Sequence, residues 1–437
     1  MEKMKKIVSP IVLFSLILGW SNIASAQTDI HISGPRGGFP VAVPKLCFSS
    51  AGATESEKIS DQISKNLDIS GLFKVVNPNS FVESASKCSQ PKEIAYSDWS
   101  VIGAEGVVKG LVSPAGGGQI SVEMLLFDVQ QQKAVLGKRY TAPASDTKKI
   151  GDRFSNEIIK YFTGELGIFG SQIAYVSKVG RFKELFVMDI DGSNPRKITQ
   201  DKGLAITPSW SPSGDQIVYT SYRTRKPELY LISPKGGEPQ RVTRLDGIEI
   251  GAEFSRSGRE IVTSASMLGS PNIVLMDLRG KLLRKITSSS AIDVSPSWSP
   301  DNSKVVFCSN RGGGPQIYIT STEGGSGNAR RISFTGSKYC TSPSWSPKGD
   351  KIAYVCRNKG NQIYVSDADG SNTSQLTFSG DNEDPGWSPD GKFLVFSSDF
   401  GKRGPRNIAM MPLATAQPRQ ISFSRTEDSQ PAWSPRF

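Results

Sequence analysis

The feature that most constrains this chain is a unit of forty-odd residues that occurs six times in its C-terminal part. The best-marked element is an aromatic residue beside a Ser-Pro turn, followed by a β-branched strand, as in PSWSPSGDQIVY at residues 208–219. A unit of this length with four short strand-like segments is typical of one blade of a β-propeller. The six aromatic positions, at spacings of 44, 44, 47, 42 and 46 residues, are Trp210, Phe254, Trp298, Trp345, Trp387 and Trp433.

The two ends of this region predict a closed ring. The last unit stops four residues after Trp433, so the strand that should follow the turn is missing. The region begins with residues 172–176, which have the composition of that missing strand and no turn motif before them. An open solenoid is the alternative, but it would leave two exposed sheet edges. We therefore expect a six-bladed all-β propeller over residues 168–437, closed by pairing of the C-terminal strand with the first propeller strand.

Residues 27–165 have a different pattern, which predicts a small α/β domain. Apolar residues recur every four positions in residues 55–69 and 152–162, as helices that bury one face require. Strand-like segments surround these two helices, and residues 164–167 form a short link to the propeller. The expected strands are residues 41–43, 73–76, 120–125 and 135–140.

Residues 1–26 have the order of a secretory signal peptide. Three lysines precede an apolar run at residues 7–20, and Ala24-Ser25-Ala26 is a small-residue cleavage pattern. A membrane anchor is the alternative, but the run of 14 residues is shorter than the ~20 needed to cross a membrane. We expect cleavage before Gln27 and an exported protein without a lipid anchor, since the residue after the cleavage site is not cysteine.

The composition excludes several kinds of catalytic site. The chain has a single histidine, His31, so Ser-His-Asp, Cys-His and multi-histidine metal sites would all depend on that one residue. There is no Gly-x-Ser-x-Gly motif. The formal charge is +11, yet basic residues occur only in short pairs such as Arg196-Lys197, which does not favour nucleic-acid binding. We expect no catalytic residues, no cofactor and no metal.

Two other motifs invite a ligand-binding interpretation. Residues 189–194 and 367–372 resemble calcium loops, but glycine is at the fourth position instead of the sixth and no glutamate follows at the twelfth, so hairpin turns are expected. The repeated aromatic residues could form a ladder for sugars. We favour a structural role, in which each aromatic side chain fills the wedge between two neighbouring blades.

All five cysteines are in the exported part, where disulfides can persist. Cys340 and Cys356 are equally distant from the centre of a predicted hairpin turn at residues 346–350, so a cross-strand disulfide is expected. We also expect a disulfide between Cys47 and Cys88. Cys308 then remains as a small buried apolar residue.

The loop before each aromatic strand should lie at the central opening of the propeller, here called the mouth, because that strand is the innermost. These loops contain many acidic residues and almost no basic ones, which predicts an acidic rim that steers a complementary partner. Ordinary solvated loop acids are the alternative. The candidate partner-binding residues of the mouth are Ile206, Thr207, Ile248, Glu249, Ile250, Gly251, Asp293, Val294, Ser295, Tyr339, Thr341, Asn382, Glu383, Asp384, Glu427, Asp428 and Ser429.

A protein-binding scaffold agrees best with the lack of catalytic groups. A secreted propeller hydrolase or lyase would need a nucleophile and a base that the sequence does not offer. A secreted carbohydrate-binding propeller remains the alternative, because tryptophan and acidic loops suit sugars.

The chain resembles the TolB family of the Tol-Pal system over essentially the whole mature length. The motifs that carry the resemblance are the PxWSPDG-type repeats and the ending PAWSPRF, together with first-domain segments that ordinary propellers lack. These segments are residues 40–44 (PVAVP), 68–73 (DISGLF), 98–104 (DWSVIGA), 136–140 (LGKRY) and 163–165 (TGE).

The resemblance implies a non-catalytic, monomeric scaffold of the periplasm. It implies binding of the peptidoglycan-associated lipoprotein Pal through the propeller mouth, with the second and third mouth loops at residues 248–251 and 293–295 most involved. It also implies binding of the inner-membrane protein TolA through the N-terminal segment, and a role in outer-membrane integrity and in outer-membrane constriction during cell division. The N-terminal segment consists of Gln27, Thr28, Asp29, Ile30, His31 and Ile32.

Overall fold

The computed structural model describes residues 38–49, 52–82, 93–243, 247–267, 269–323 and 329–436. By its internal contacts the chain divides into Met1–Ser33 and Gly34–Phe437, and all described residues belong to the second unit. The expected signal peptide, the N-terminal segment at residues 27–32 and Cys88 therefore lie outside the described residues. Within the described ranges, no helix has the length and apolar character needed to cross a membrane.

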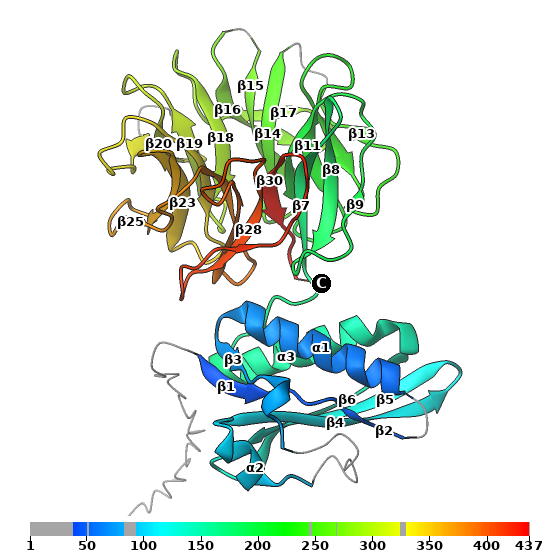
Figure 1. Cartoon of the computed structure of the whole chain (residues 1–437). Helices are drawn as coiled ribbons and strands as arrows, with labels where there is room; N and C mark the ends of the chain where they lie inside the picture. The colour runs from blue at the N-terminus through cyan, green and yellow to red at the C-terminus, as the bar shows by residue number, and fades with distance from the viewer. Residues whose placement is uncertain are drawn as a thin grey trace, which may run out of the picture. The chain divides into compact units, whose positions relative to one another are not determined.

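The N-terminal part is one six-stranded sheet with helices packed on it (Figure 1). The strand order is β3-β1-β4-β5-β6, with β2 also paired to β4. Strand β1 runs parallel to β3 and β4, whereas β4, β5 and β6 are antiparallel. The elements are β1 (Phe39–Ala42), β2 (Cys47–Phe48), α1 (Ala53–Ser70), β3 (Phe73–Val75), η1 (Pro78–Ser80), α2 (Tyr96–Val101), β4 (Gly106–Gly116), β5 (Gln119–Asp128), β6 (Lys133–Pro143), η3 (Ala144–Asp146) and α3 (Thr147–Thr163).

The two long helices form because each has one apolar stripe to bury. Ile59, Ile63 and Leu67 of α1 are fully buried in the same core cluster as Phe154 and Ile158 of α3. Each helix ends at a glycine in the left-handed region, which only glycine adopts at little cost. Both predicted helices are confirmed, although each begins earlier than predicted.

The C-terminal part consists of six four-stranded antiparallel sheets arranged as a propeller (Figure 1). In five of them the strand order follows the chain. These are β10 (Ala205–Trp210), β11 (Ile217–Ser221), β12 (Glu228–Ile232) and β13 (Gln240–Arg241); β14 (Ile248–Phe254), β15 (Glu260–Ser266), β16 (Asn272–Asp277) and β17 (Leu282–Lys285); β18 (Asp293–Trp298), β19 (Lys304–Ser309), β20 (Gln316–Ser321) and β21 (Arg330–Arg331); β22 (Cys340–Trp345), β23 (Lys351–Arg357), β24 (Asn361–Asp367) and β25 (Ser374–Gln375); and β26 (Asn382–Trp387), β27 (Phe393–Ser398), β28 (Asn407–Pro412) and β29 (Arg419–Gln420).

The sixth sheet joins the two ends of the propeller sequence. Its order is β30 (Asp428–Trp433), β7 (Gln172–Val179), β8 (Phe182–Asp189) and β9 (Arg196–Lys197). Strand β30 runs antiparallel to β7, and the Ser434 backbone N–H donates to the Gln172 carbonyl at 2.8 Å. The innermost strands contact each other around the whole ring, in the order β10, β14, β18, β22, β26, β30 and again β10. The predicted closure is therefore present.

The repeated aromatic residues fill the seams between neighbouring sheets. All six are at most 8% exposed. Trp298 packs against residues of the preceding sheet, including Val262 and Leu275, and its indole N–H donates to the Glu253 carbonyl of that sheet at 3.2 Å. The structural interpretation is confirmed, and the carbohydrate-binding alternative loses the tryptophans that supported it.

The structure contains the predicted cross-strand disulfide. Cys340 and Cys356 are directly opposed in the β22–β23 ladder and are bonded to each other. Cys308 on β19 is a buried free thiol, as predicted. Cys47 is also disulfide-bonded, but Cys88, its predicted partner, lies outside the described residues.

Candidate functional site

The mouth is built from the same backbone irregularity in all six sheets. Near the start of each innermost strand one residue has φ between +49° and +66°, and the pairing with the next strand shifts there. Such bulges redirect a strand at the rim of a barrel or propeller. Neighbouring sheets stabilise the bulges: the Gly251 N–H donates to Thr220 Oγ1 at 3.1 Å, and the Thr207 N–H donates to Gln430 Oε1 at 2.9 Å. The six bulge residues are Thr207, Gly251, Ser295, Ser342, Asp384 and Gln430.

Two sets of loops form one surface around this opening, here called the mouth face. Among the described residues, loops that lead into innermost strands are hydrogen-bonded to hairpin loops between second and third strands. Examples are the Tyr222 N–H to the Leu204 carbonyl at 2.9 Å and the Arg357 N–H to the Tyr339 carbonyl at 3.0 Å. The mouth face comprises the candidate residues and the described loops 178–183, 199–204, 222–227, 269–271, 288–292, 310–315, 333–339, 357–360, 377–381, 399–406 and 422–427.

The structure brings all the candidate mouth residues to this face, but with very different exposure. Ile248, Ser295 and Tyr339 are exposed. Glu249, Asp293, Asn382, Asp428 and Ser429 are buried. The half-buried candidates are Ile206, Thr207, Ile250, Gly251, Val294, Thr341, Glu383, Asp384 and Glu427.

The predicted acidic rim is wrong. Asp293 is completely buried and ion-paired with Arg311, while Glu383 and Glu427 both pair with Arg406. A buried carboxylate is stable only when a cation or hydrogen-bond donors satisfy it. These two arginines belong to hairpin loops between second and third strands. The predicted acidic rim considered only the loops before the innermost strands, so it did not include their positive charges.

The exposed charges of the mouth face are basic. No acidic residue described in its loops is exposed. The exposed charged residues are Lys178, Arg181, Lys202, Arg223, Arg225, Lys226, Lys338, Arg357, Lys359, Lys402, Arg403 and Arg425.

Two mouth carboxyls have pKa values close to neutrality. Burial raises the pKa of Glu249 to about 7, although a hydrogen bond from the Thr243 hydroxyl at 3.0 Å opposes the change. Burial and the neighbouring Glu383 charge raise the pKa of Asp384 to about 6. The charge on the inner rim of the mouth therefore changes over the pH range of ordinary buffers.

This face also carries exposed apolar residues that the sequence patterns did not indicate. Leu204 and Ile292 are exposed beside the innermost strands, and Phe334, Phe378 and Phe423 are exposed further out. Alignment of the repeats identifies the position of the three phenylalanines, but not their exposure. A pocket of about 690 Å³ is lined by residues that include Asp381, Arg406, Arg425 and Glu427, and Asp381 and Arg425 follow Phe378 and Phe423 by three and two residues in the sequence.

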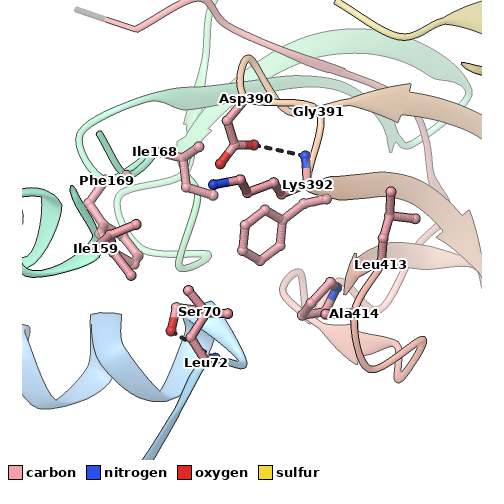
Figure 2. A pocket seen from close by; sticks show the side chains of 13 residues that line it. Ser70, Leu72, Ile159, Ile168, Phe169, Asp390, Gly391, Lys392, Leu413 and Ala414 are labelled. Atoms are coloured by element: carbon pink, nitrogen blue, oxygen red, sulfur yellow. Dashed lines mark hydrogen bonds between the residues drawn. The ribbon is translucent and has the colours of Figure 1, made fainter. Parts of the chain in front are cut away.

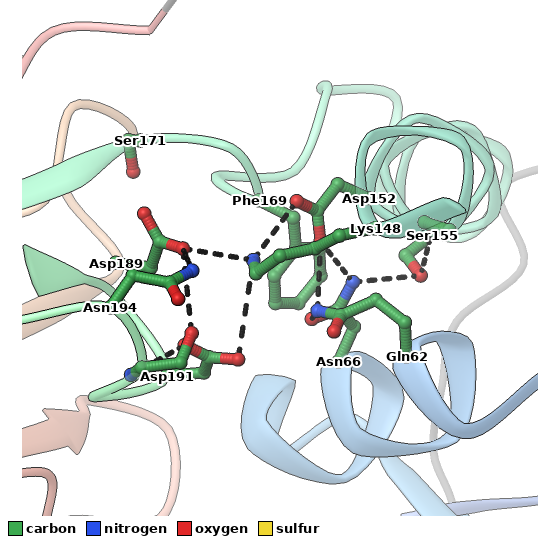
Figure 3. Close-up of polar contacts among 12 residues, drawn as sticks. Gln62, Asn66, Lys148, Asp152, Ser155, Phe169, Ser171, Asp189, Asp191 and Asn194 are labelled. Atoms are coloured by element: carbon green, nitrogen blue, oxygen red, sulfur yellow. Dashed lines mark hydrogen bonds and ion pairs between the residues drawn. The ribbon is translucent and has the colours of Figure 1, made fainter. Parts of the chain in front are cut away.

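The calcium-like turns have other partners for their carboxylates. Asp189 and Asp191 face Lys148 of α3, whose Nζ is 3.5 and 4.0 Å from their carboxylate oxygens (Figure 3). The same Nζ is 3.2 Å from Asp152, and Lys65 is 3.0 Å from Asp191. Both turns are hairpin turns as predicted. Among the described residues, no group of three His, Cys, Asp or Glu is arranged to hold a metal.

A smaller cavity of about 210 Å³ has a mainly apolar lining (Figure 2). Leu72, Ile159 and Phe169 line it together with Phe393 and Leu413. Asp390 at its edge accepts a hydrogen bond from the Lys392 backbone N–H at 3.0 Å, so this carboxylate is already used. The lining offers no set of convergent polar groups for chemistry.

Family comparisons match both parts of the chain. The family described as TolB beta propeller domain matches residues 159–437, and the family described as TolB amino-terminal domain matches residues 29–135. A crystal structure of TolB from Acinetobacter baumannii superposes with a TM-score of 0.78 at 26% identity, covering 92% of this chain and 98% of that one. A chain of a nidogen–laminin complex matches at 13% identity with a TM-score of 0.51, which reflects the fold alone.

Curated relatives match over part of their length. The Tol-Pal system protein TolB of Paramagnetospirillum magneticum is 34% identical over 208 residues, which are 45% of this chain and 46% of the relative. That of Chromobacterium violaceum is 30% identical over 214 residues, 49% and 48% of the two chains. The matched region thus spans about half the length of these relatives.

Proposed function

Because the chain belongs to the TolB family, we propose that it is a non-catalytic protein-binding scaffold of the Tol-Pal system that works in the periplasm. In this proposal the mouth face binds the peptidoglycan-associated lipoprotein Pal, and the N-terminal segment, Gln27–Ile32, binds TolA. The protein would act as a monomer that maintains outer-membrane integrity and supports outer-membrane constriction during cell division.

The observation that carries the proposal is the form of the mouth face. Six equivalent bulges surround the opening, hydrogen bonds to neighbouring sheets hold those at Thr207 and Gly251, and exposed apolar side chains such as Ile248 and Tyr339 lie on the same face. A protein surface that combines apolar residues with a charged rim is typical of a docking site for another protein.

The chemistry of the described residues also supports binding over catalysis. The one buried free thiol, Cys308, has its pKa raised to about 12 by burial and by the nearby Asp293 charge, which makes it a poor nucleophile. Asp293, Glu383 and Glu427 of the mouth are ion-paired with arginines. The only histidine of the sequence belongs to the N-terminal segment.

The test is a pull-down from an envelope extract with the mature chain, with and without residues 27–34. We expect the complete chain to recover Pal and TolA, and the truncated chain to recover Pal only. Ile248→Ser should weaken recovery of Pal, whereas Leu283→Ser, a similarly exposed apolar residue on the outer strand β17, should not. Recovery of no lipoprotein by the complete chain would refute the proposal.

A further inference from the structure

One position of the repeat is structurally equivalent in all six sheets. Two residues beyond the end of each fourth strand, a Thr or Ser hydroxyl accepts a hydrogen bond from a backbone N–H of the third strand. The six bonds, between 2.8 and 3.1 Å, join Leu185 to Thr199, Leu229 to Thr243, Ile273 to Thr287, Ile317 to Ser333, Ile363 to Thr377 and Ile408 to Ser422. Because this hydrogen bond fixes the backbone at the Thr or Ser, the residue that follows it occupies an equivalent position in each sheet.

At that next residue, three consecutive sheets have phenylalanine. Phe334, Phe378 and Phe423 are 64%, 78% and 79% exposed. The corresponding residues of two other sheets are Gln200 and Ser288, and the last, Arg244, lies outside the described residues. Folding therefore does not require an aromatic residue here. A single exposed apolar residue needs no explanation, but a row of three on one face indicates an interaction site.

The exposed charges around the phenylalanine row have one sign. The exposed charged residues of this sector of the mouth face are Lys338, Arg357, Lys359, Lys402, Arg403 and Arg425. The acidic residues nearby are half-buried and accept hydrogen bonds within the chain: Asp381 from the Asn361 N–H at 2.8 Å, and Asp399 from the Gly401 N–H at 2.9 Å. The charged groups that an approaching partner meets first are therefore cations, which attract anions.

We propose that the phenylalanine row and its basic surroundings form the outer part of the docking surface, and that the partner bound there presents an acidic surface around an apolar centre. This inference rests on the proposed function and adds the chemistry of the partner. Buried aromatic anchors carry most of the affinity in protein interfaces, and rim charges mainly set the association rate. A folded protein can fill the 690 Å³ pocket whose lining includes Asp381 and Arg425, three and two residues after Phe378 and Phe423, whereas a flat bilayer cannot.

The first experiment measures the affinity of the mature chain for the soluble domain of Pal from the same source. The variant replaces all three phenylalanines by serine (F334S/F378S/F423S), and the matched control is Phe48→Ser, an exposed phenylalanine of β2. We expect the Kd to rise at least tenfold for the triple variant and less than twofold for the control. Thermal unfolding should be unchanged in both, because the side chains are exposed.

The second experiment reverses two charges. Lys402→Glu with Arg403→Glu should slow association about tenfold at low salt, and the difference should shrink as salt is added. Lys74→Glu, an exposed lysine of the N-terminal sheet, is the control and should have little effect. If association is unchanged or faster after the reversal, the inference that the partner presents an acidic surface is overturned.

The remaining outcomes separate the two proposals. If the wild-type chain does not bind the Pal domain, the proposed function fails. If the wild type binds and the triple variant binds equally well, only the inference fails. Phosphatidylglycerol vesicles are the third probe: if the triple variant loses vesicle binding but keeps its affinity for Pal, the row serves a bilayer and the assignment to a protein partner is overturned.

Discussion

The Nη2 atom of Arg311 lies 3.1 and 3.0 Å from the two carboxylate oxygens of Asp293. The carboxylate is completely buried, and the guanidinium also lies over the rings of Phe307 and Tyr318. A mouth acid that its loop position makes a candidate for partner binding is thus part of an internal ion pair.

The first prediction follows from that pair. Asp293→Ala should lower the free energy of unfolding by about 3–5 kcal/mol, because it leaves a largely buried cation without its counter-charge. Chemical denaturation followed by tryptophan fluorescence measures the change. Glu427→Ala, which removes a half-buried carboxylate, is the control and should cost less than about 1 kcal/mol. Equal effects of the two substitutions would mean that Asp293 has no special structural role.

The second prediction concerns the wedge residues. Trp298→Ala should cost about 3–5 kcal/mol of stability, because it opens a cavity between two sheets and leaves the Glu253 carbonyl without its indole donor. Phe378→Ala removes an exposed aromatic ring of the same propeller and should leave thermal unfolding unchanged. Normal melting of the Trp298 variant would contradict the structural role of the repeated aromatics.

The third prediction concerns pH. The pKa of Glu249 is raised to about 7 in the folded chain from an ordinary value near 4.5, so its protonated form is favoured by folding. The stability associated with this group is complete below about pH 4.5 and is lost as the pH rises through 7, by up to about 3 kcal/mol. Glu249→Gln should therefore flatten the decrease in melting temperature between pH 5 and pH 8. An identical pH profile in the variant would show that Glu249 ionises without penalty.

The fourth prediction concerns the lysine that faces three carboxylates. Lys148→Met should lower stability at pH 7 by about 1–3 kcal/mol, because Asp152, Asp189 and Asp191 lose a shared cation. Burial alone would raise the pKa of Asp191, but hydrogen bonds from Ser193 and the positive charge of Lys148 hold this pKa below its usual value. That contribution is present above about pH 3.8 and is lost as the pH falls through the folded-state pKa, so the difference from wild type should shrink in acid. Lys149→Met, at an exposed pair with Asp146, is the control.

The fifth prediction concerns the cysteines. Peptide mapping without reduction should find Cys340 joined to Cys356, and Cys308 should resist alkylation until the chain unfolds because burial raises the pKa of its thiol. Replacing both bonded cysteines by alanine should cost about 3 kcal/mol for a loop of this size. An alkylated Cys308 in the native protein would contradict its burial.

Local sequence patterns were sufficient for much of this molecule. The number of blades follows from the repeat, the helices from the four-residue apolar spacing of Ile59, Ile63 and Leu67, and the disulfide from the equal distance of two cysteines from one turn. Each of these is a relation along a single element or between neighbouring strands. Strand β4 was not predicted, because Gly110, Pro114 and Gly116 make its sequence look like a loop.

The character of the mouth face was decided by tertiary structure alone. Asp293 begins strand β18 and Arg311 lies in the loop after β19, 18 residues later, and only the folded hairpin brings them together. Counting charges in the mouth loops treats every carboxylate as exposed, whereas the fold buries the acids or pairs them with Arg311 and Arg406 and leaves most other lysines and arginines exposed. The same applies to Phe334, Phe378 and Phe423, because whether an apolar side chain packs or projects depends on what the rest of the chain places against it.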